Sequence, residues 1–174
     1  MPTKLSTDAS IAEPITCILS DVDGVMTDGR IIYDDHGIET KRFHVRDGLG
    51  IKLWMRSGFS FAILSARQGN AVKQRALELG IEQVAQGFED KWPAAEALFE
   101  TLGCTPAQVC YIGDDLPDIA VMTRVALAVA PADAATDARD AAHWVLRKQG
   151  GEGAIRELIE RLLRAKGRWQ EHLG

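Results

Sequence analysis

The sequence predicts an α/β fold built on a doubly wound, mainly parallel sheet. Short apolar runs alternate with longer helical patterns along the chain, which is typical of strands joined by crossover helices. The apolar runs suit strands that are buried on both faces. Gly58, Gly80 and Gly103 each stand where a helical pattern stops, the position at which glycine favours a helix C-terminus.

The same patterns predict the individual elements in chain order. The apolar runs predict strands at residues 15–19, 59–64, 84–85, 109–112, 125–129 and 144–146. Helical patterns lie near residues 48–57, 69–79, 91–102 and 116–123. A last amphipathic helix runs from about residue 152 to 165, with Ile155, Leu158, Ile159, Leu162 and Leu163 on one stripe.

Residues 29–45 break the alternation and predict a β-hairpin that leaves the sheet just after the first strand. Their sequence, GRIIYDDHGIETKRFHV, indicates two strands joined by a turn at residues 34–37. Because a two-stranded ribbon is marginally stable alone, the hairpin indicates contact with partner subunits. The predicted organisation is a disordered lead-in at 1–14, one domain at 15–166 with the hairpin inside it, and a C-terminal tail at 167–174.

Composition and charge exclude several classes of function. The chain has 174 residues, 46% of them hydrophobic and 26% charged, with a net charge of −5, which argues against a nucleic-acid partner. No apolar run approaches the roughly 18–20 residues that span a bilayer, and the N-terminus lacks the apolar stretch of a signal peptide. The three cysteines form no CxxC pair, so we expect a reduced, cytoplasmic location away from membranes.

Polar residues follow four of the predicted strands. They are DVDGVMTDG at 21–29, Ser-Ala-Arg at 65–67, Asp-Lys at 90–91 and GDDLPD at 113–118. Because ligands bind at the carboxyl ends of the strands in an open parallel sheet, these segments should meet at one edge. Four acidic side chains would converge there: Asp21, Asp23, Asp114 and Asp115.

This acidic group predicts a metal site suited to phosphoryl transfer. Carboxylates that close repel one another unless a cation lies among them, and oxygen ligands suit Mg²⁺. We predict Asp21, Asp23 and Asp114 as the metal ligands. Arg67 and Lys91 would offset the charge of an anionic substrate. A metal, a phosphate-sized anion and a carboxylate nucleophile together indicate phosphoryl transfer through an aspartyl-phosphate.

Each of four residues has a predicted catalytic role. Asp21 is the nucleophile, and Asp23 protonates the leaving group and then activates water. Ser65 donates its hydroxyl to a phosphoryl oxygen, and Lys91 neutralises charge that develops on the equatorial oxygens. Plain structural roles stay open as well, since Ser65 could be an ordinary turn residue and Lys91 a solvated residue at a helix start.

Asp115 and Asp118 are predicted to support the metal site without binding the metal. Asp118 lies one helical turn after Asp114 and would brace that ligand or the metal's waters. Either residue could also be a simple helix cap.

The motifs DxDG at 21–24, Ser65, Lys91 and GDDxxD at 113–118 resemble the haloacid-dehalogenase (HAD) superfamily in order and in position after strands. The stretches DVDGVMTDGRIIYDDHG, KRFHVRDGLGIKL and GGEGAIREL resemble the 3-deoxy-D-manno-octulosonate 8-phosphate (KDO 8-phosphate) phosphatase family over about residues 15 to 163. The resemblance implies an HAD-like core without a cap domain and a Mg²⁺-dependent phosphatase of lipopolysaccharide synthesis. It also implies a homotetramer in which the hairpins meet and the tail reaches an adjoining active site.

The resemblance also implies which residues contact the sugar phosphate. They are Asp23, His44, Val45, Arg46, Asp47, Gly48, Lys52, Arg67, Arg75 and Lys91. The residues themselves support part of this set, because Gly48 is expected to open a helix whose N–H groups favour an anion, with Lys52 one turn along it. Arg75 is expected on the same helical face as Arg67, and an arginine fork suits a sugar-acid carboxylate. A solvated helix face explains Lys52 and Arg75 equally well.

Three alternatives stay open. One is a phosphatase for a nine-carbon sugar acid 9-phosphate, which differs only in the pocket. A second is a phospho-aspartate receiver domain, which the order of the motifs disfavours, because receivers carry adjacent acids after the first strand and the phosphoacceptor after the third. The third is a non-catalytic relative, which the intact acidic set disfavours. Trp92, directly after Lys91, has no explanation in the sequence.

Overall fold

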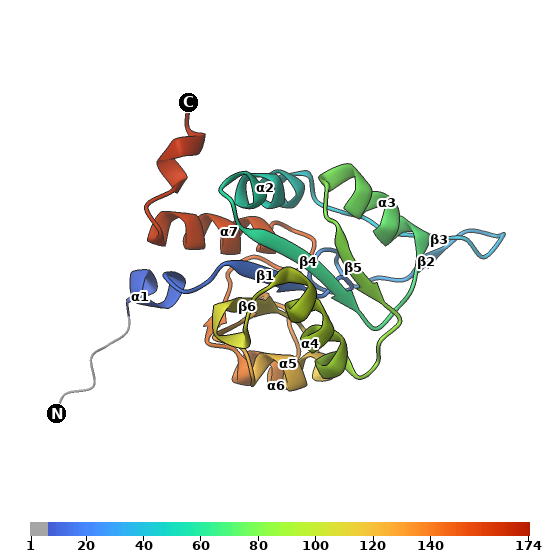
Figure 1. The fold of residues 1–174 in the computed structure, drawn as a ribbon. Coiled ribbons are helices and arrows are strands. Elements are labelled where there is room, and N and C mark those ends of the chain that lie inside the picture. The colour runs from blue at the N-terminus through green and yellow to red at the C-terminus, as the bar shows by residue number, and fades with distance from the viewer. Residues whose placement is uncertain (1–6) are drawn as a thin grey trace.

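A six-stranded parallel sheet forms the centre of the molecule in a computed structural model that describes residues 7–174 (Figure 1). In spatial order the strands are β5 (Gln83–Gln86), β4 (Ser60–Ser65), β1 (Cys17–Ser20), β6 (Val109–Ile112), β7 (Leu127–Ala130) and β8 (Trp144–Val145). This architecture confirms the predicted α/β fold with a doubly wound parallel sheet.

The strand order places a topological switch point at β1. The chain moves outward from β1 through β4 to β5, and then returns to the other side of β1 to build β6, β7 and β8. Ser20, the last residue of β1, lies opposite Ile63 of β4 and Ile112 of β6. Ligand sites of doubly wound sheets lie at such a point, beyond the carboxyl end of the strand.

Helices cover both faces of the sheet (Figure 1). One face carries α2 (Val45–Arg56), α3 (Asn70–Leu79) and α7 (Ala154–Ala165), and the other carries α4 (Lys91–Leu102), α5 (Ile119–Met122) and α6 (Thr136–Ala141). Because side chains alternate along a strand, Ile18 joins the apolar cluster under α2 and α7 while Leu19 joins the cluster under α4 and α5. Buried apolar layers on both sides therefore hold β1 rigidly.

Two helices begin or divide differently from the sequence expectation. The helix expected near 48–57 begins at Val45, because His44 caps it by accepting the Arg46 N–H at Nδ1, 3.2 Å away. The Gly48 N–H donates to the His44 carbonyl within the helix, so Gly48 does not open it. The pattern at 116–123 divides into a 3₁₀ turn over Leu116–Asp118 and the short α5.

The hairpin consists of β2 (Ile32–Tyr33) and β3 (Glu39–Thr40), which pair antiparallel and project away from the body of the molecule (Figure 1). Asp34 stabilises its turn, because one carboxylate oxygen accepts the N–H groups of His36 and Ile38 at 2.9 and 2.8 Å. Several large apolar side chains of this segment are exposed: Ile31, Ile32, Tyr33 and Ile38.

The expected disordered lead-in at 1–14 is corrected where the structure describes it. Residues 1–6 lie outside the described residues, but Asp8–Ala12 form helix α1. Asp8 makes a two-pronged ion pair with Arg161 of α7, at 2.7 and 2.8 Å, and Ala12 is fully buried. These contacts order the segment against α7.

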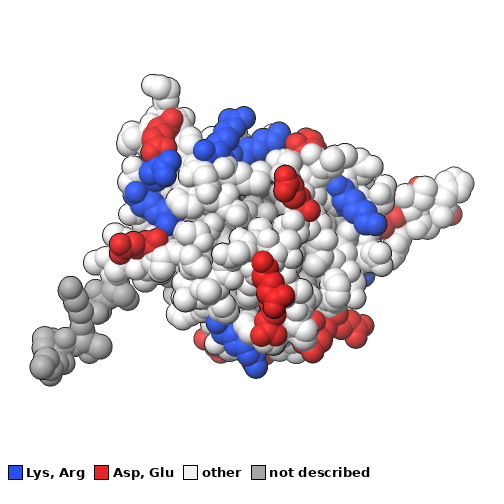
Figure 2. Space-filling model, viewed as in Figure 1, with Lys and Arg blue, Asp and Glu red and all other residues white. Residues whose placement is uncertain are grey.

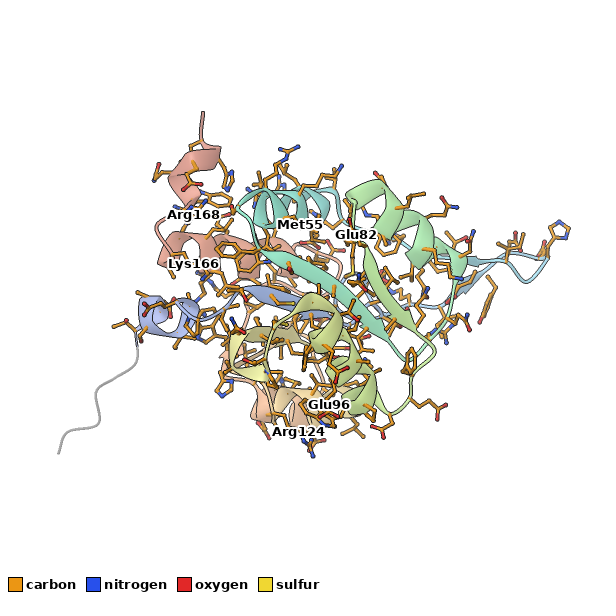
Figure 3. All side chains as sticks on the ribbon, viewed as in Figure 1. Met55, Glu82, Glu96, Arg124, Lys166 and Arg168 are labelled. Atoms are coloured by element: carbon orange, nitrogen blue, oxygen red, sulfur yellow. The ribbon has the colours of Figure 1, made fainter. Side chains whose placement is uncertain are left out.

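The C-terminal tail packs on its own chain. Trp169, in a 3₁₀ turn over Trp169–His172, is 5% exposed and lies 5.1 Å from the guanidinium groups of both Arg156 and Arg164. Ser57, at the end of α2, makes a 3.0 Å hydrogen bond with His172. The tail therefore packs against α7 and the end of α2 of its own chain, near the labelled Lys166 and Arg168 (Figure 3).

On the face seen in Figure 2, Lys and Arg lie in separate groups among acidic residues and make no continuous basic patch. Between residues 7 and 174, no helix is both long enough and apolar enough to cross a bilayer.

Candidate active site

Carboxylates from distant parts of the chain meet at the carboxyl ends of β1 and β6. Asp21 directly follows β1, and its N–H donates to the Ile112 carbonyl of β6 at 3.0 Å. Carboxylate oxygens of Asp21, Asp114 and Asp118 lie within 4.8 Å of one another. Of the four acidic residues predicted to converge, Asp21 and Asp114 therefore meet at this edge, and Asp118, which is predicted only to support the metal site, joins them.

Lys91 supplies the positive charge inside this group. It begins α4, is 2% exposed, and its Nζ lies 2.9 Å from Asp21 Oδ1 and 2.6 Å from Asp118 Oδ1. Burial alone would lower the pKa of Lys91, but the charges of Asp21 and Asp118 outweigh it and raise that pKa above its usual value. Lys91 is therefore a charged partner of Asp21 and not a solvated residue at a helix start.

Asp118 braces the site and has no acceptor position left for a metal. Its Oδ1 accepts from Lys91 and from the buried Tyr111 hydroxyl, and its Oδ2 accepts the N–H groups of Asp114 and Asp115 at 2.8 and 3.1 Å. A carboxylate has about four acceptor positions, and all four are used here. We call Asp21, Lys91, Tyr111 and Asp118 the inner ion cluster.

Asp21 and Asp114 fit a divalent cation. Burial, together with the charges of neighbouring carboxylates, raises the pKa of Asp21 to about 7 and that of Asp114 to about 8. A cation between them would relieve this cost, and carboxylate oxygens are ligands that Mg²⁺ prefers. Gly24 leaves room for Asp114, because a Cβ at this position would lie 1.9 Å from Asp114 Oδ2. Its φ of +89° is also a backbone conformation that favours glycine.

The side chain of Asp23 lies outside the acidic group. Its Oδ1 accepts a hydrogen bond from Lys41, and its Oδ2 lies 3.9 Å from Arg67 Nε. Glu39 completes the arrangement, because its Oε1 lies 3.2 Å from Lys41 Nζ and 2.7 Å from Arg67 Nη2. We call Asp23, Glu39, Lys41 and Arg67 the outer ion cluster.

Sequence reasoning missed Glu39 and Lys41. They stand two residues apart on an extended segment, so their side chains share one face, and this spacing is the signal that could have found them. Burial raises the pKa of Glu39, but hydrogen bonds from Arg67 and Lys41 outweigh it and leave the pKa below its usual value. Glu39 is therefore an ionised member of the cluster.

Ser65 ends β4 at the same edge of the sheet and is 1% exposed. Its Oγ accepts the Arg67 N–H at 3.2 Å, which leaves the hydroxyl hydrogen free to donate.

Asp115 is exposed and caps the turn that follows it by accepting the Leu116 N–H at 2.8 Å. Its place in the structure thus matches the helix-cap alternative.

Among the residues expected to contact substrate, some make contacts within the fold, and others are exposed or half-buried on α2. Asp47 is 3% exposed and faces α7, where its Oδ1 accepts the Arg156 N–H at 2.7 Å, so it caps that helix from α2. Gly48 packs beneath Arg75, because a Cβ there would lie 2.3 Å from Arg75 Nη2. His44 uses Nδ1 as the cap of α2. Val45 and Arg46 are exposed at the start of that helix, and Lys52 is half-buried.

Arg67 and Arg75 do not share a helical face. Helix α3 begins at Asn70, so Arg67 lies in the preceding loop and only Arg75 lies on the helix. Arg75 binds Glu78 at 2.9 Å and lies 5.7 Å from the centre of the Phe43 ring. The predicted relation between the two arginines is therefore wrong, since Arg67 precedes even the helix that is predicted near residues 69–79.

Two further segments gain a structural explanation. Gly150 and Gly151 lie against the turn after Asp23. A Cβ on Gly150 would lie 1.9 Å from the Gly24 carbonyl oxygen, and the Gly151 N–H donates to the Val25 carbonyl at 3.0 Å.

Trp92 packs edge-on against Phe99, with 6.2 Å between the ring centres. Arg124, labelled in Figure 3, lies over the Trp92 ring, 5.2 Å from its centre. Trp92 therefore packs α4 against the segment that follows α5.

Comparisons with known proteins agree with this geometry. A model of haloacid dehalogenase-like hydrolases matches residues 83–158. The 3-deoxy-D-manno-octulosonate 8-phosphate phosphatase of Yersinia pestis is 44% identical over 163 residues, which cover 94% of this chain and 87% of that protein. The protein of the same name from Escherichia coli K12 is 42% identical over the same shares.

Solved structures show the same fold. The Moraxella catarrhalis 3-deoxy-D-manno-octulosonate 8-phosphate phosphatase, in complex with a magnesium ion, a phosphate ion and a KDO molecule, superposes with a TM-score of 0.92 at 36% identity over 97% of each chain. The Yersinia pestis crystal structure gives a TM-score of 0.92 at 42% identity, over 95% of this chain and 90% of that chain. The chain therefore belongs to the 3-deoxy-D-manno-octulosonate 8-phosphate phosphatase family of haloacid dehalogenase-like hydrolases.

Proposed function

We propose that this protein is a Mg²⁺-dependent phosphatase that hydrolyses KDO 8-phosphate to KDO and phosphate. The observation that carries the proposal is the meeting of Asp21, Asp114 and Lys91 at the carboxyl end of β1. The family relatives carry this activity in their names, and one was crystallised with magnesium, phosphate and KDO. The substrate is thus a sugar phosphate.

The first chemical step is phosphoryl transfer to Asp21. An Asp21 carboxylate oxygen forms a bond to phosphorus, and the bond between phosphorus and the ester oxygen breaks. The electron pair of that bond stays on the ester oxygen, which takes a proton from Asp23. Bound Mg²⁺, held by Asp21 and Asp114, would neutralise negative charge on the phosphoryl oxygens.

The second step releases phosphate. Asp23, now ionised, takes a proton from water as the water oxygen attacks phosphorus, and the bond from phosphorus to Asp21 breaks. Lys91, 2.9 Å from Asp21 Oδ1, offsets the charge of the phosphoryl oxygens, and the Ser65 hydroxyl donates to one of them. Asp118 positions both Lys91 and the backbone of Asp114 for this work.

The proposal extends to assembly and location. We propose one phosphatase domain over residues 15–166 that acts as a homotetramer in the cytoplasm. The exposed apolar side chains on the hairpin support the assembly, because such side chains favour burial against a partner. Cys17, Cys104 and Cys110 are all free thiols, which agrees with a reducing compartment.

A two-substrate assay tests the proposal. Purified protein with Mg²⁺ is given KDO 8-phosphate or a nine-carbon sugar acid 9-phosphate, and phosphate release is followed over many turnovers. We expect higher kcat/KM for KDO 8-phosphate and no turnover with EDTA. Equal or better turnover of the nine-carbon substrate would reject the substrate assignment. A single sub-stoichiometric phosphorylation without turnover would instead point to a receiver domain.

A further inference from the structure

The outer ion cluster links the hairpin to Asp23. We infer that Lys41 is a positioning residue that holds the Asp23 carboxylate in place for proton transfer, an inference that rests on the proposed function. Lys41 lies directly after β3, so its backbone belongs to the hairpin, whereas Asp23 lies on the turn after β1. The two residues meet only because the hairpin strand returns past the carboxyl end of the sheet.

Lys41 is built into the site and is not a surface lysine. Its side chain is 2% exposed, although the side chains of its partners Asp23 and Glu39 are 19% and 16% exposed. A buried ammonium group is costly unless charged partners satisfy it. Lys41 has two carboxylate partners, which explains how the chain keeps a lysine at this depth.

The orientation of Asp23 depends on Lys41 in particular. Among residues 7–174, Lys41 is the one side chain that donates a hydrogen bond to the Asp23 carboxylate. Arg67 Nε lies 3.9 Å from Asp23 Oδ2, which is beyond hydrogen-bond distance. Lys41 therefore binds Oδ1 and leaves Oδ2 as the oxygen available for the leaving group.

Glu39 ties the two cations of the cluster together. It binds Lys41 and Arg67 through the same oxygen, Oε1, at 3.2 and 2.7 Å. The cluster therefore contains two carboxylates and two cations, which balance in charge. Through Glu39 and Lys41, the position of β3 sets the position of Asp23.

This arrangement makes a selective kinetic prediction. Lys41 does not contact the inner ion cluster, so its loss should leave attack by Asp21 intact. An alkyl leaving group needs a proton from Asp23, whereas p-nitrophenolate is stable enough to leave without one. Loss of Lys41 should therefore slow the transfer from an alkyl ester and spare the transfer from an aryl ester.

The experiment measures the first turnover of KDO 8-phosphate and of p-nitrophenyl phosphate by rapid quench in the full chain with Mg²⁺. For Lys41→Met we expect the sugar-phosphate rate to fall by about 100-fold, at the lower end of general-acid effects. The first-turnover rate for p-nitrophenyl phosphate should stay within roughly 3-fold of the wild-type rate. Arg42→Met is the matched control, because Arg42 is the neighbouring cation and its side chain is 66% exposed.

Lys41→Arg, which keeps the charge and a hydrogen-bond donor, should recover much of the sugar-phosphate rate. Equal losses on both esters, or no loss on either, would overturn the inference. If Lys41→Met does not fold, Glu39→Gln takes its place, with a selective loss of roughly 10-fold expected and an unselective result overturning the inference. A wild-type protein that hydrolyses neither ester would instead contradict the proposed function and remove the basis of the inference with it.

Discussion

The two aspartates after β1 belong to two different ion clusters, and the chain builds these clusters in different ways. The inner ion cluster takes Asp21 from the residue after β1, Tyr111 from β6, Asp118 from the 3₁₀ turn after β6 and Lys91 from the start of α4. Apolar layers on both faces of the sheet therefore position it. The outer ion cluster takes Glu39 and Lys41 from a hairpin whose strands are two residues long each. Asp21 and Asp23 are two residues apart in sequence, yet each belongs to a different cluster.

Because of this difference, the sheet core and the hairpin position different residues of the proposed reaction. The sheet core positions the proposed nucleophile and its counter-charge, where a small displacement would cost packing energy. The hairpin positions the proposed proton donor, where little apolar contact resists movement. Variants of the inner ion cluster should therefore change both stability and activity, and variants at the far end of the molecule should change neither strongly.

The largest expected effect is on activity at the centre of the inner ion cluster. Asp21→Asn should abolish phosphate release, because a neutral amide does not attack phosphorus, while the circular dichroism spectrum stays unchanged. Asp90→Asn is the control, because Asp90 is exposed and its side chain makes no capping hydrogen bond to α4. Substantial turnover by Asp21→Asn would remove the nucleophile assignment.

Lys91→Met should lose activity and also destabilise the fold by about 3–5 kcal/mol, because it leaves buried carboxylates without their cation. Urea unfolding measures the free energy of unfolding. Lys73→Met, an exposed position on α3, is the matched control. A loss of stability no greater than that of the control would show that the inner ion cluster is not part of the core.

Mg²⁺ should stabilise the protein more at high pH than at low pH. Without metal, burial raises the pKa of Asp21 to about 7 and of Asp114 to about 8, from 3.8 for the free side chain. Between these values the folded state binds more protons than the unfolded state, so stability falls as pH rises from about 4 to about 8. Since Mg²⁺ binds the ionised forms, the rise in Tm on adding Mg²⁺ should be larger near pH 8 than near pH 5. Equal rises at both would contradict the site.

Tyr111→Phe should have a moderate effect. It removes one of four hydrogen bonds to Asp118 and leaves Lys91 in place, so we expect a loss of about 1.5–3 kcal/mol in the free energy of unfolding. We expect turnover to fall only a few-fold. A loss of activity as complete as that of Lys91→Met would mean that the hydroxyl acts in the chemistry itself.

Arg161→Ala, at the amino-terminal edge of the sheet, should have the smallest effect. Its ion pair with Asp8 is partly exposed, and such pairs contribute roughly 0.2–1 kcal/mol. Thermal unfolding should shift slightly, and turnover should match the wild-type value. A clear loss of activity would show that this edge communicates with the site.

Periodicity and local chemistry predicted much of this molecule. The six strand positions, the long helices and the acidic segments after β1 and β6 all follow from short stretches of sequence. The prediction failed where a contact from elsewhere in the chain decides the outcome. Asp47 is an example, because only the position of α7 makes it a helix cap.

What the sequence by itself determined is the fold class, the family and the set of acidic residues at the strand ends, because apolar runs, glycine stops and carboxylate spacing are local properties. What only the tertiary structure decided is how the charges pair. Asp23 with Lys41, Asp118 with Lys91 and Asp8 with Arg161 are separated by 18, 27 and 153 residues. Local patterns carry no signal for such pairs, since their partners are chosen by the packing of the sheet, the hairpin and the helices.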